Sequence, residues 1–181
     1  MIGFLVATLG LAAQEYTLHK SSSSLKVEGT STLHDWELEA EELTGNASIV
    51  LKEGVVETIN KLNFDVKVES LKSHKSGMDK NTYKALKSDQ HPKISYLFTR
   101  VISITDTKDG QLIKTGGKLT IAGMTKSTYL DVVAKTAGGI SFEGSTTFKM
   151  SDYGVEPPIA LMGTIKTGDE VTIKFNVEYA K

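Results

Sequence analysis

The chain has 181 residues and a formal net charge of −1, from 21 Lys and Arg against 22 Asp and Glu. This length suits one domain with a sizeable core, and the balanced charge excludes the basic surface that nucleic-acid-binding domains carry. The sequence contains no Cys, which excludes a disulfide framework and thiol chemistry.

The N-terminus is an apolar run from Met1 to Ala13 that ends in small residues. This pattern predicts a secretory signal peptide over residues 1–13 and a mature domain over residues 14–181. The run is too short for a transmembrane helix, which needs about 20 apolar residues. Because no Lys or Arg precedes the run, a first strand is the alternative interpretation. We expect a periplasmic or secreted protein.

Two strands are expected early in the chain, over Leu25–Gly29 and Leu33–Ala40, because apolar and polar residues alternate there. The inward residues have odd numbers in the first segment. They have even numbers in the second, where His34 and Trp36 share the inner face. Such a change of parity requires a bulge or a bend, which we expect near residues 31–33.

The most regular alternation lies at the centre of the chain. Leu62–Leu71 is predicted to be a half-buried strand with Phe64, Val66 and Val68 on its inner face.

Residues 94–104 repeat this alternation, with Tyr96, Phe98 and Ile102 expected to point inward. Arg100 is the single interruption of the apolar run. It indicates either a position near the rim or a strand that has left the core.

One helix is predicted between these two strands, over Met78–Lys87. Met78, Tyr83 and Leu86 can share one side of this helix and cover one end of the fold, while Asp79 and the lysines face water.

The remaining chain reads as further strands and turns, with Ser151–Gly168 as a long loop that admits a helical turn at Ile159–Met162. The regular spacing of alternating strands predicts an all-β fold, either a sandwich or a barrel. The length of the strands and the Gly, Ala and Thr residues on their apolar faces favour an antiparallel up-and-down eight-stranded barrel with one short helix. A barrel of eight strands is wide enough to be filled by side chains or to hold one small ligand. The other expected strands are Tyr16–Leu18, Leu43–Leu51, Val55–Lys61, Leu112–Gly116 continued by Lys118–Ala122, Thr128–Ala134, Ile140–Met150 and Val171–Tyr179.

The sequence does not favour an enzyme. Its four histidines show no metal-ligand spacing, and Gly116-Gly117-Lys118 is followed by Leu119 instead of the Ser or Thr of a phosphate-binding loop. A nucleophile elbow of the G-x-S-x-G kind is also missing from the sequence. We predict a protein that is not an enzyme and needs no metal or cofactor.

The candidate ligand-binding residues are the inward apolar side chains together with His34, whose imidazole can donate to a polar head group. Each of them has an alternative role as an ordinary core residue, and for any single residue that role is the commoner one. The candidate set consists of His34, Trp36, Phe64, Val66, Val68, Met78, Tyr83, Leu86, Tyr96, Phe98, Leu119, Ile121, Phe142, Phe148 and Phe175.

Several motifs together resemble the YceI-like family of exported proteins. They are Gly29–Trp36, Val68–Leu71 with the following helix, His91–Tyr96, Gly117–Lys126 and Phe148–Val155. The resemblance implies a lipocalin-like barrel that binds a long isoprenoid or similar amphiphilic chain, such as an isoprenoid quinone or a polyprenyl lipid, without catalysis.

Two stretches depart from the family's pattern. Met78–Thr82 lacks the arginine and histidine that many members carry, and Lys149–Asp152 lacks their arginine. Head-group recognition through those residues is therefore not expected. The alternative function is that of a packed-barrel envelope, stress or adhesion protein without a small-molecule ligand. A homodimer remains an open alternative to a single copy.

Overall fold

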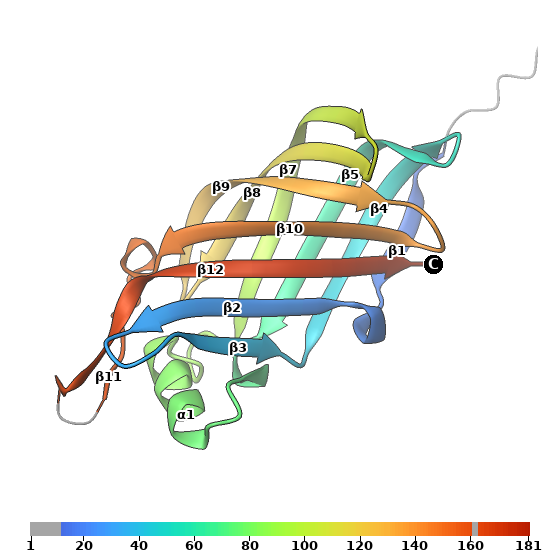
Figure 1. Ribbon diagram of the computed structural model, residues 1–181. Helices are drawn as coiled ribbons and strands as arrows, with labels where there is room; N and C mark the ends of the chain where they lie inside the picture. Colours follow the sequence, from blue (N-terminus) through green and yellow to red (C-terminus); the bar gives the residue numbers. More distant parts are fainter. Residues whose placement is uncertain (1–11, 161–162) are drawn as a thin grey trace, which may run out of the picture.

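Figure 1 shows a computed structural model of the protein, which describes residues 12–160 and 163–181. Most of the predicted signal peptide therefore lies outside the described residues. The helices are α1 (Ser76–Ala85) and the short 3₁₀ turns η1 (Lys20–Ser22), η2 (Val68–Ser70) and η3 (Met150–Tyr153). The strands are β1 (Gln14–Leu18), β2 (Ser24–Ser31), β3 (Trp36–Ala40), β4 (Leu43–Lys52), β5 (Val55–Lys67), β6 (Leu71–Lys72), β7 (Lys93–Thr107), β8 (Gly110–Ile121), β9 (Met124–Lys135), β10 (Ile140–Lys149), β11 (Ile159–Ala160) and β12 (Ile165–Ala180).

Eight antiparallel strands form a closed ring in the order β1-β4-β5-β7-β8-β9-β10-β12. The ring closes where β1 pairs with the end of β12, with Thr17 opposite Ala180 and Leu18 opposite Tyr179. This confirms the predicted all-β, eight-stranded barrel. Away from this closure, β12 pairs with β2 instead, and β3 and β6 extend the sheet beyond the ring.

Tight hairpins join several of the long strands. The turns at Glu53-Gly54 and Ala122-Gly123 each have two residues with positive φ, at 54° and 82° and at 47° and 83°. Two positive φ values define a type I′ turn, whose twist matches that of the flanking strands. The first turn lies between the predicted strands Leu43–Leu51 and Val55–Lys61, whereas the second begins at Ala122, which was expected to end a strand.

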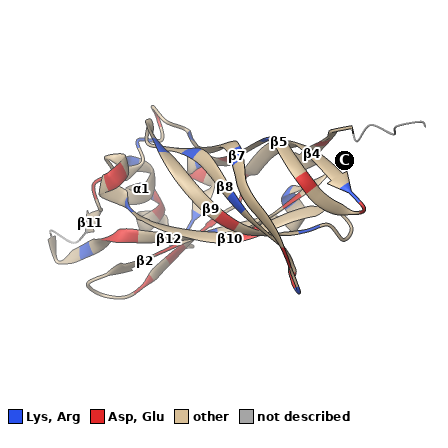
Figure 2. Ribbon diagram, turned by 90° about the horizontal axis from the view of Figure 1, so that it is seen from above, with Lys and Arg blue, Asp and Glu red and all other residues tan. Residues whose placement is uncertain are grey.

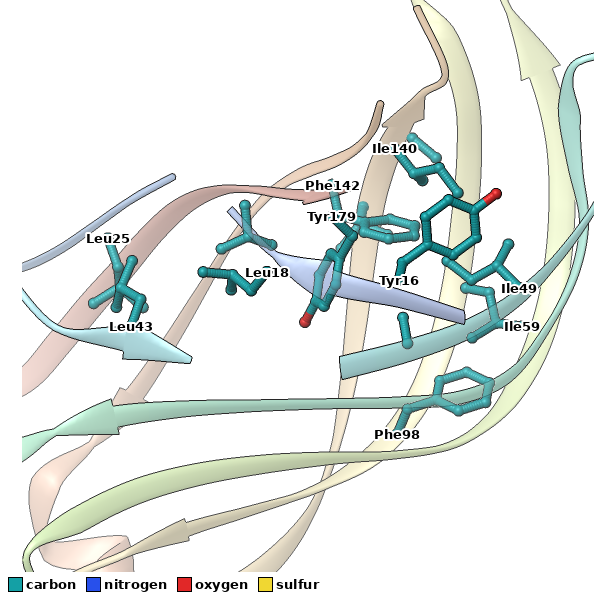
Figure 3. Close-up of a cluster of buried hydrophobic side chains, with 14 of the residues drawn as sticks. Tyr16, Leu18, Leu25, Leu43, Ile49, Ile59, Phe98, Ile140, Phe142 and Tyr179 are labelled. Atoms are coloured by element: carbon teal, nitrogen blue, oxygen red, sulfur yellow. The ribbon is translucent and has the colours of Figure 1, made fainter. Parts of the chain in front are cut away.

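One end of the barrel is filled by a packed cluster of side chains (Figure 3). Tyr16, Ile49, Ile140 and Tyr179 are at most 6 % exposed there, and Phe142 meets Tyr179 edge-to-face at 6.1 Å between ring centroids. The Tyr179 hydroxyl donates to the Asn63 carbonyl oxygen at 2.9 Å, so its polar atom is satisfied within the cluster. This end lies near the C-terminus of the chain (Figure 1).

The helix α1 lies at the opposite end of the barrel, near β11 (Figures 1 and 2). It has no buried residue, although Met78 and Leu86 pack against the edge of the core. Lysines and acidic residues are interspersed over the outside of the strands (Figure 2), as in the cross-strand pair Lys26–Glu37 at 2.8 Å. Exposed pairs of this kind add little stability individually. Among the helices of the described residues, none has the length and apolar character needed to cross a membrane.

The structure corrects two of the central strand predictions. The strand expected over Leu62–Leu71 begins earlier, at Val55, and ends at Lys67. Val68 therefore lies in the 3₁₀ turn η2 and not on a strand face. In β7, the register with β8 shifts between Phe98 and Arg100 and again beyond Val101. Each shift changes whether the even-numbered or the odd-numbered residues point inward. Ile102 is consequently 50 % exposed instead of inward, and Val101 packs against the core.

Two further predictions of local structure are wrong in part. The expected bend near residues 31–33 is a complete reversal of the chain, because β2 and β3 pair as an antiparallel hairpin. The helical turn expected at Ile159–Met162 is a short strand over Ile159–Ala160, and the last two of its residues lie outside the described range.

Candidate ligand-binding cavity

The barrel contains a cavity of about 760 Å³ at the end covered by α1. Its walls come from β2, β3, α1, β7, β8, β10, η3, β11 and β12, so residues distant in sequence meet around it. The apolar lining residues include Val27, Trp36, Leu38, Leu71, Met78, Leu86, Ile94, Ile121, Phe148, Tyr153, Val155 and Ile173.

A smaller chamber of about 100 Å³ lies beside this cavity, on the side of the packed end. Val27, Leu71, Ile94 and Ile173 line both spaces, and these four residues are here called the neck. The lining of the inner chamber is almost entirely apolar and includes Phe64, Tyr96, Phe98, Leu119, Phe142, Phe175 and Tyr179. The lining of the two spaces suits the apolar chain of a ligand.

Glycines on the inner face allow aromatic rings to lie flat against the barrel wall. A Cβ atom on Gly29 would lie 2.2 Å from a ring carbon of Trp36, its partner across the β2–β3 pair. A Cβ atom on Gly117 would lie 2.4 Å from the ring of Tyr96. Each ring therefore occupies the space of the missing side chain, and the centre of the barrel stays open.

The polar groups of the cavity gather at its outer rim. Ser31, Lys75, Lys80 and Asn81 contribute to the lining there, and the two lysines are exposed. His34 also borders the rim, but it lies in the turn after β2, is exposed, and has Nδ1 2.7 Å from the carbonyl oxygen of Asp35. The prediction that His34 sits on the inner face of a strand is wrong, because β3 begins only at Trp36.

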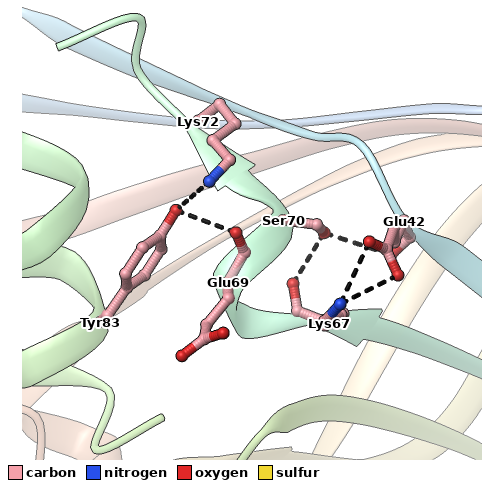
Figure 4. Close-up of polar contacts among 6 residues, drawn as sticks. All are labelled: Glu42, Lys67, Glu69, Ser70, Lys72 and Tyr83. Atoms are coloured by element: carbon pink, nitrogen blue, oxygen red, sulfur yellow. Dashed lines mark hydrogen bonds and ion pairs between the residues drawn. The ribbon is translucent and has the colours of Figure 1, made fainter. Parts of the chain in front are cut away.

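Tyr83 holds α1 to the barrel through a polar contact (Figure 4). Its hydroxyl accepts a hydrogen bond from Lys72 Nζ at 2.7 Å and lies 2.9 Å and 3.0 Å from the carbonyl oxygens of Glu69 and Leu71, to which it can donate. The bond to Tyr83 raises the pKa of Lys72 above its usual value. Tyr83 therefore anchors the helix and does not line the cavity.

A second contact fixes the start of the helix. Asp79 Oδ1 accepts hydrogen bonds from the Ser73 amide at 2.8 Å and the Ser73 hydroxyl at 2.6 Å. Partial burial acts to raise the pKa of Asp79, but the two bonds from Ser73, with help from Lys72 and His74, outweigh it and lower the pKa. The expectation that Asp79 simply faces water is wrong, because it joins the helix to the preceding loop.

The structure brings thirteen of the fifteen candidate residues to the two chambers. The exceptions are Tyr83, which anchors the helix, and Val68, which is buried in η2. The candidate set omits the neck residues, of which Ile94 continues the alternation of Tyr96. It also omits Tyr153, the last residue of η3, and Val155 just after it, which lie in a segment without any periodicity.

In the part of the chain that the structure describes, no group of three or more His, Asp or Glu residues is placed to hold a metal ion. Every buried polar side-chain atom in the same range has a hydrogen-bond partner. The polar groups open to a ligand are therefore those of the rim.

Several crystal structures have a similar fold. BcnA from Burkholderia cenocepacia superposes with a TM-score of 0.72 at 15 % identity, over 91 % of this chain and 99 % of that chain. A polyisoprenoid-binding domain from Saccharophagus degradans gives a TM-score of 0.65 at 15 % identity, over 91 % and 97 % of the two chains. The YceI protein of Campylobacter jejuni gives 0.58 at 20 % identity, over 78 % and 83 %.

At these identities the likeness establishes the fold alone. Among curated proteins, no sequence matches this chain. The YceI-like domain, however, matches residues 16–179, which span the barrel, the helix and the cavity walls. The chain therefore belongs to the YceI-like family.

Proposed function

We propose that this protein is a non-catalytic carrier for a long-chain isoprenoid or a similar amphiphilic lipid, held inside the barrel. The observation that carries the proposal is the apolar cavity of about 760 Å³, which shares part of its wall with a smaller inner chamber and has its polar groups at the rim. This arrangement suits a ligand with a long tail and a polar head, such as an isoprenoid quinone or a polyprenyl lipid. The tail lies inward, past the neck, and the head stays at the rim.

Burial of the tail supplies the affinity in this proposal. Each buried methylene contributes about 0.8 kcal/mol, so ten such groups contribute roughly 8 kcal/mol before the costs of association. Few polar contacts are then needed. The polar rim residues contact only the head group, which supports binding without chemistry.

Family membership and one structural neighbour support the same class of ligand. The Saccharophagus degradans protein is described as a polyisoprenoid-binding domain. The apolar run at residues 1–13 supports export, and we propose a periplasmic or secreted location for the carrier.

The packed-barrel alternative describes only one half of the molecule. Its interior would have no continuous cavity, and the cluster around Tyr179 meets this description. The half under α1 does not, because the cavity and its inner chamber occupy it.

Trp36 offers a direct test, since it is the only tryptophan and lines the cavity. Purified protein is titrated with a short-tailed and a long-tailed isoprenoid quinone, and quenching of tryptophan fluorescence is followed. Native mass spectrometry of protein from its own host identifies any lipid that co-purifies.

A variant at the neck tests the path of the tail. Val27→Phe narrows the passage between the chambers, and we expect it to weaken binding of the long-tailed quinone about tenfold or more while sparing the short-tailed one. Val133→Phe, the same change on the outer face of β9, is the control. Protein that shows no saturable quenching and carries no lipid would refute the proposal.

A further inference from the structure

The large cavity, the inner chamber and the packed end follow one another along the strands. On β8, the inward side chains are Ile121 at the large cavity, Leu119 at the inner chamber and Ile113, which lines neither space and is 0 % exposed. On β10, Phe148 lines the large cavity and Phe142 the inner chamber. An apolar tail that enters from the large cavity therefore meets the packed end last.

Three aromatic side chains stand where the inner chamber meets the packed end. Phe98 from β7, Phe142 from β10 and Tyr179 from β12 all line the inner chamber, although they are only 9 %, 3 % and 0 % exposed. All three belong to the buried cluster in Figure 3. Ile140, the next inward residue of β10, is 1 % exposed and lines neither space. The open interior therefore ends at these three rings.

Tyr179 is held across the barrel by a hydrogen bond. Its hydroxyl donates to the Asn63 carbonyl oxygen of β5, although β1 and β4 lie between β12 and β5 in the ring. Gly45 of β4 leaves space for this bond, because a Cβ atom there would lie 2.9 Å from the hydroxyl oxygen and 2.5 Å from the carbonyl oxygen. Burial raises the pKa of Tyr179, so the hydroxyl keeps its proton and remains a donor. The side chain is thus fixed across the interior.

The neighbouring rings reinforce this position. The planes of Phe142 and Tyr179 meet at 73°, which is a favourable edge-to-face contact. Phe98 approaches the same cluster from β7, on another part of the ring. Because the single polar atom of the three side chains is bonded to Asn63, the surface that they turn to the chamber is apolar. It suits the end of a hydrocarbon tail and not a head group.

We propose that Phe98, Phe142 and Tyr179 form a floor that limits how deep an apolar tail enters, so that the protein selects isoprenoid lipids by tail length. A tail that just reaches the floor is buried along its whole length. Any further isoprene unit stays near the rim, where water contacts it. This inference rests on the proposed carrier function, because it concerns the same cavity and the same class of lipid.

The test is a series of isoprenoid quinones that share one head group and carry tails of increasing length. Each is supplied to the full-length protein in detergent micelles, and binding is followed by quenching of Trp36 fluorescence. Because the micelle interior is also apolar, a tail unit that is buried in the barrel changes the affinity little. We expect nearly constant affinity up to one tail length, then a fall of about tenfold for each further unit.

Two variants should move the start of this fall in opposite directions. Phe98→Ala removes a ring of about the size of one isoprene unit, so the fall should begin one unit later. The first quinone that binds the unmodified protein poorly should then bind this variant about tenfold more tightly. Thr146→Phe adds a ring to the chamber wall at a partly exposed position, and the fall should begin at a shorter tail. If Phe98→Ala does not fold, Phe98→Leu replaces it.

Ile113→Ala is the matched control, since it removes a buried side chain from the packed end without touching the floor. The register partners of Ile113 are Ile104 and Val132, and neither belongs to the floor. The variant loses core packing, but the space that it opens lies beyond the three rings. Its affinity should stay within about twofold of that of the unmodified protein at every tail length.

The outcomes separate the floor from the carrier function. Saturable quenching with constant affinity up to the longest tail would refute the floor and leave the carrier function supported. Equal shifts in Phe98→Ala and Ile113→Ala would also overturn the floor, because they would reflect a general loosening of the core. A fall that begins at the same tail length in Phe98→Ala, Thr146→Phe and the unmodified protein would do so as well. Absence of quenching at every tail length would refute the carrier function, and the floor with it.

Discussion

The two ends of the barrel are built from the same alternating strands but have opposite interiors. In β10, the inward Ile140 and Phe142 are 1 % and 3 % exposed in the packed end, whereas the inward Phe148 further along the same strand is only partly buried beside the cavity. The difference lies in how each end is closed. β1 inserts between β4 and β12 and fills the packed end with Tyr16 and other side chains.

At the other end, no strand within residues 12–160 and 163–181 performs this role. β2 and β3 leave the ring, and α1 covers the opening without burying any of its own residues. The packed half of the barrel therefore stabilises the fold, and the half under the helix contains the cavity.

The largest expected difference between the ends concerns truncation of one isoleucine in each. Ile140→Ala should reduce the free energy of unfolding by about 2–5 kcal/mol, since Ile140 is enclosed on all sides. Ile94→Ala should cost less than half as much, because one side of Ile94 already faces the chambers. Urea unfolding measures both values, and equal costs would mean that the ends do not differ in this way.

Next in size is the effect of adding a methyl group beneath Trp36. Gly29→Ala places a Cβ atom within the indole ring, so we expect a loss of about 1–3 kcal/mol and a shift of tryptophan emission as the ring moves into the cavity. Gly77→Ala in α1, where a Cβ atom would meet nothing within 4 Å, is the control and should be neutral or slightly stabilising. Unchanged emission in Gly29→Ala would contradict the packing described.

A smaller effect is expected from Tyr83→Phe, which removes the hydroxyl that ties α1 to Lys72 and Leu71. Global stability should fall by only about 1 kcal/mol, because the contact is partly exposed to water. Amide hydrogen exchange in α1 and the rate of quinone release should both increase. Tyr129→Phe on the outer wall is the matched control. Release that is equally fast in both variants would show that α1 is not held by this contact.

The smallest effect is a pH dependence at the start of the helix. The pKa of Asp79 is lowered by its Ser73 contacts, so these contacts stabilise the fold at pH values above the unfolded pKa of 3.8. The stabilisation is lost as the pH falls through the lower folded pKa. Hydrogen exchange in α1 should therefore increase below about pH 4, ahead of global unfolding. Asp79→Asn should remove this dependence, and an identical acid response in the variant would exclude Asp79 as its source.

Much of the fold was predictable because alternation at period two is a local property. The segment around Phe64 and Val66 forms a strand as expected. Trp36 also faces inward as expected, in a strand that begins at Trp36 instead of Leu33. The wrong predictions come from local irregularities that the alternation of apolar and polar residues does not reveal. Two register shifts in β7 turn Ile102 outward, and a chain reversal after Ser31 moves His34 to the rim.

The amino-acid sequence by itself determined most of the strands, the single helix and most of the side chains that face the interior, because these depend on neighbours along the chain. Only the tertiary structure decided that the interior is packed at one end and hollow at the other. That outcome depends on where β1, β2 and α1 meet the ring, and on which glycine lies beneath which aromatic ring. Contacts of this kind join residues far apart in sequence, so no local pattern encodes them.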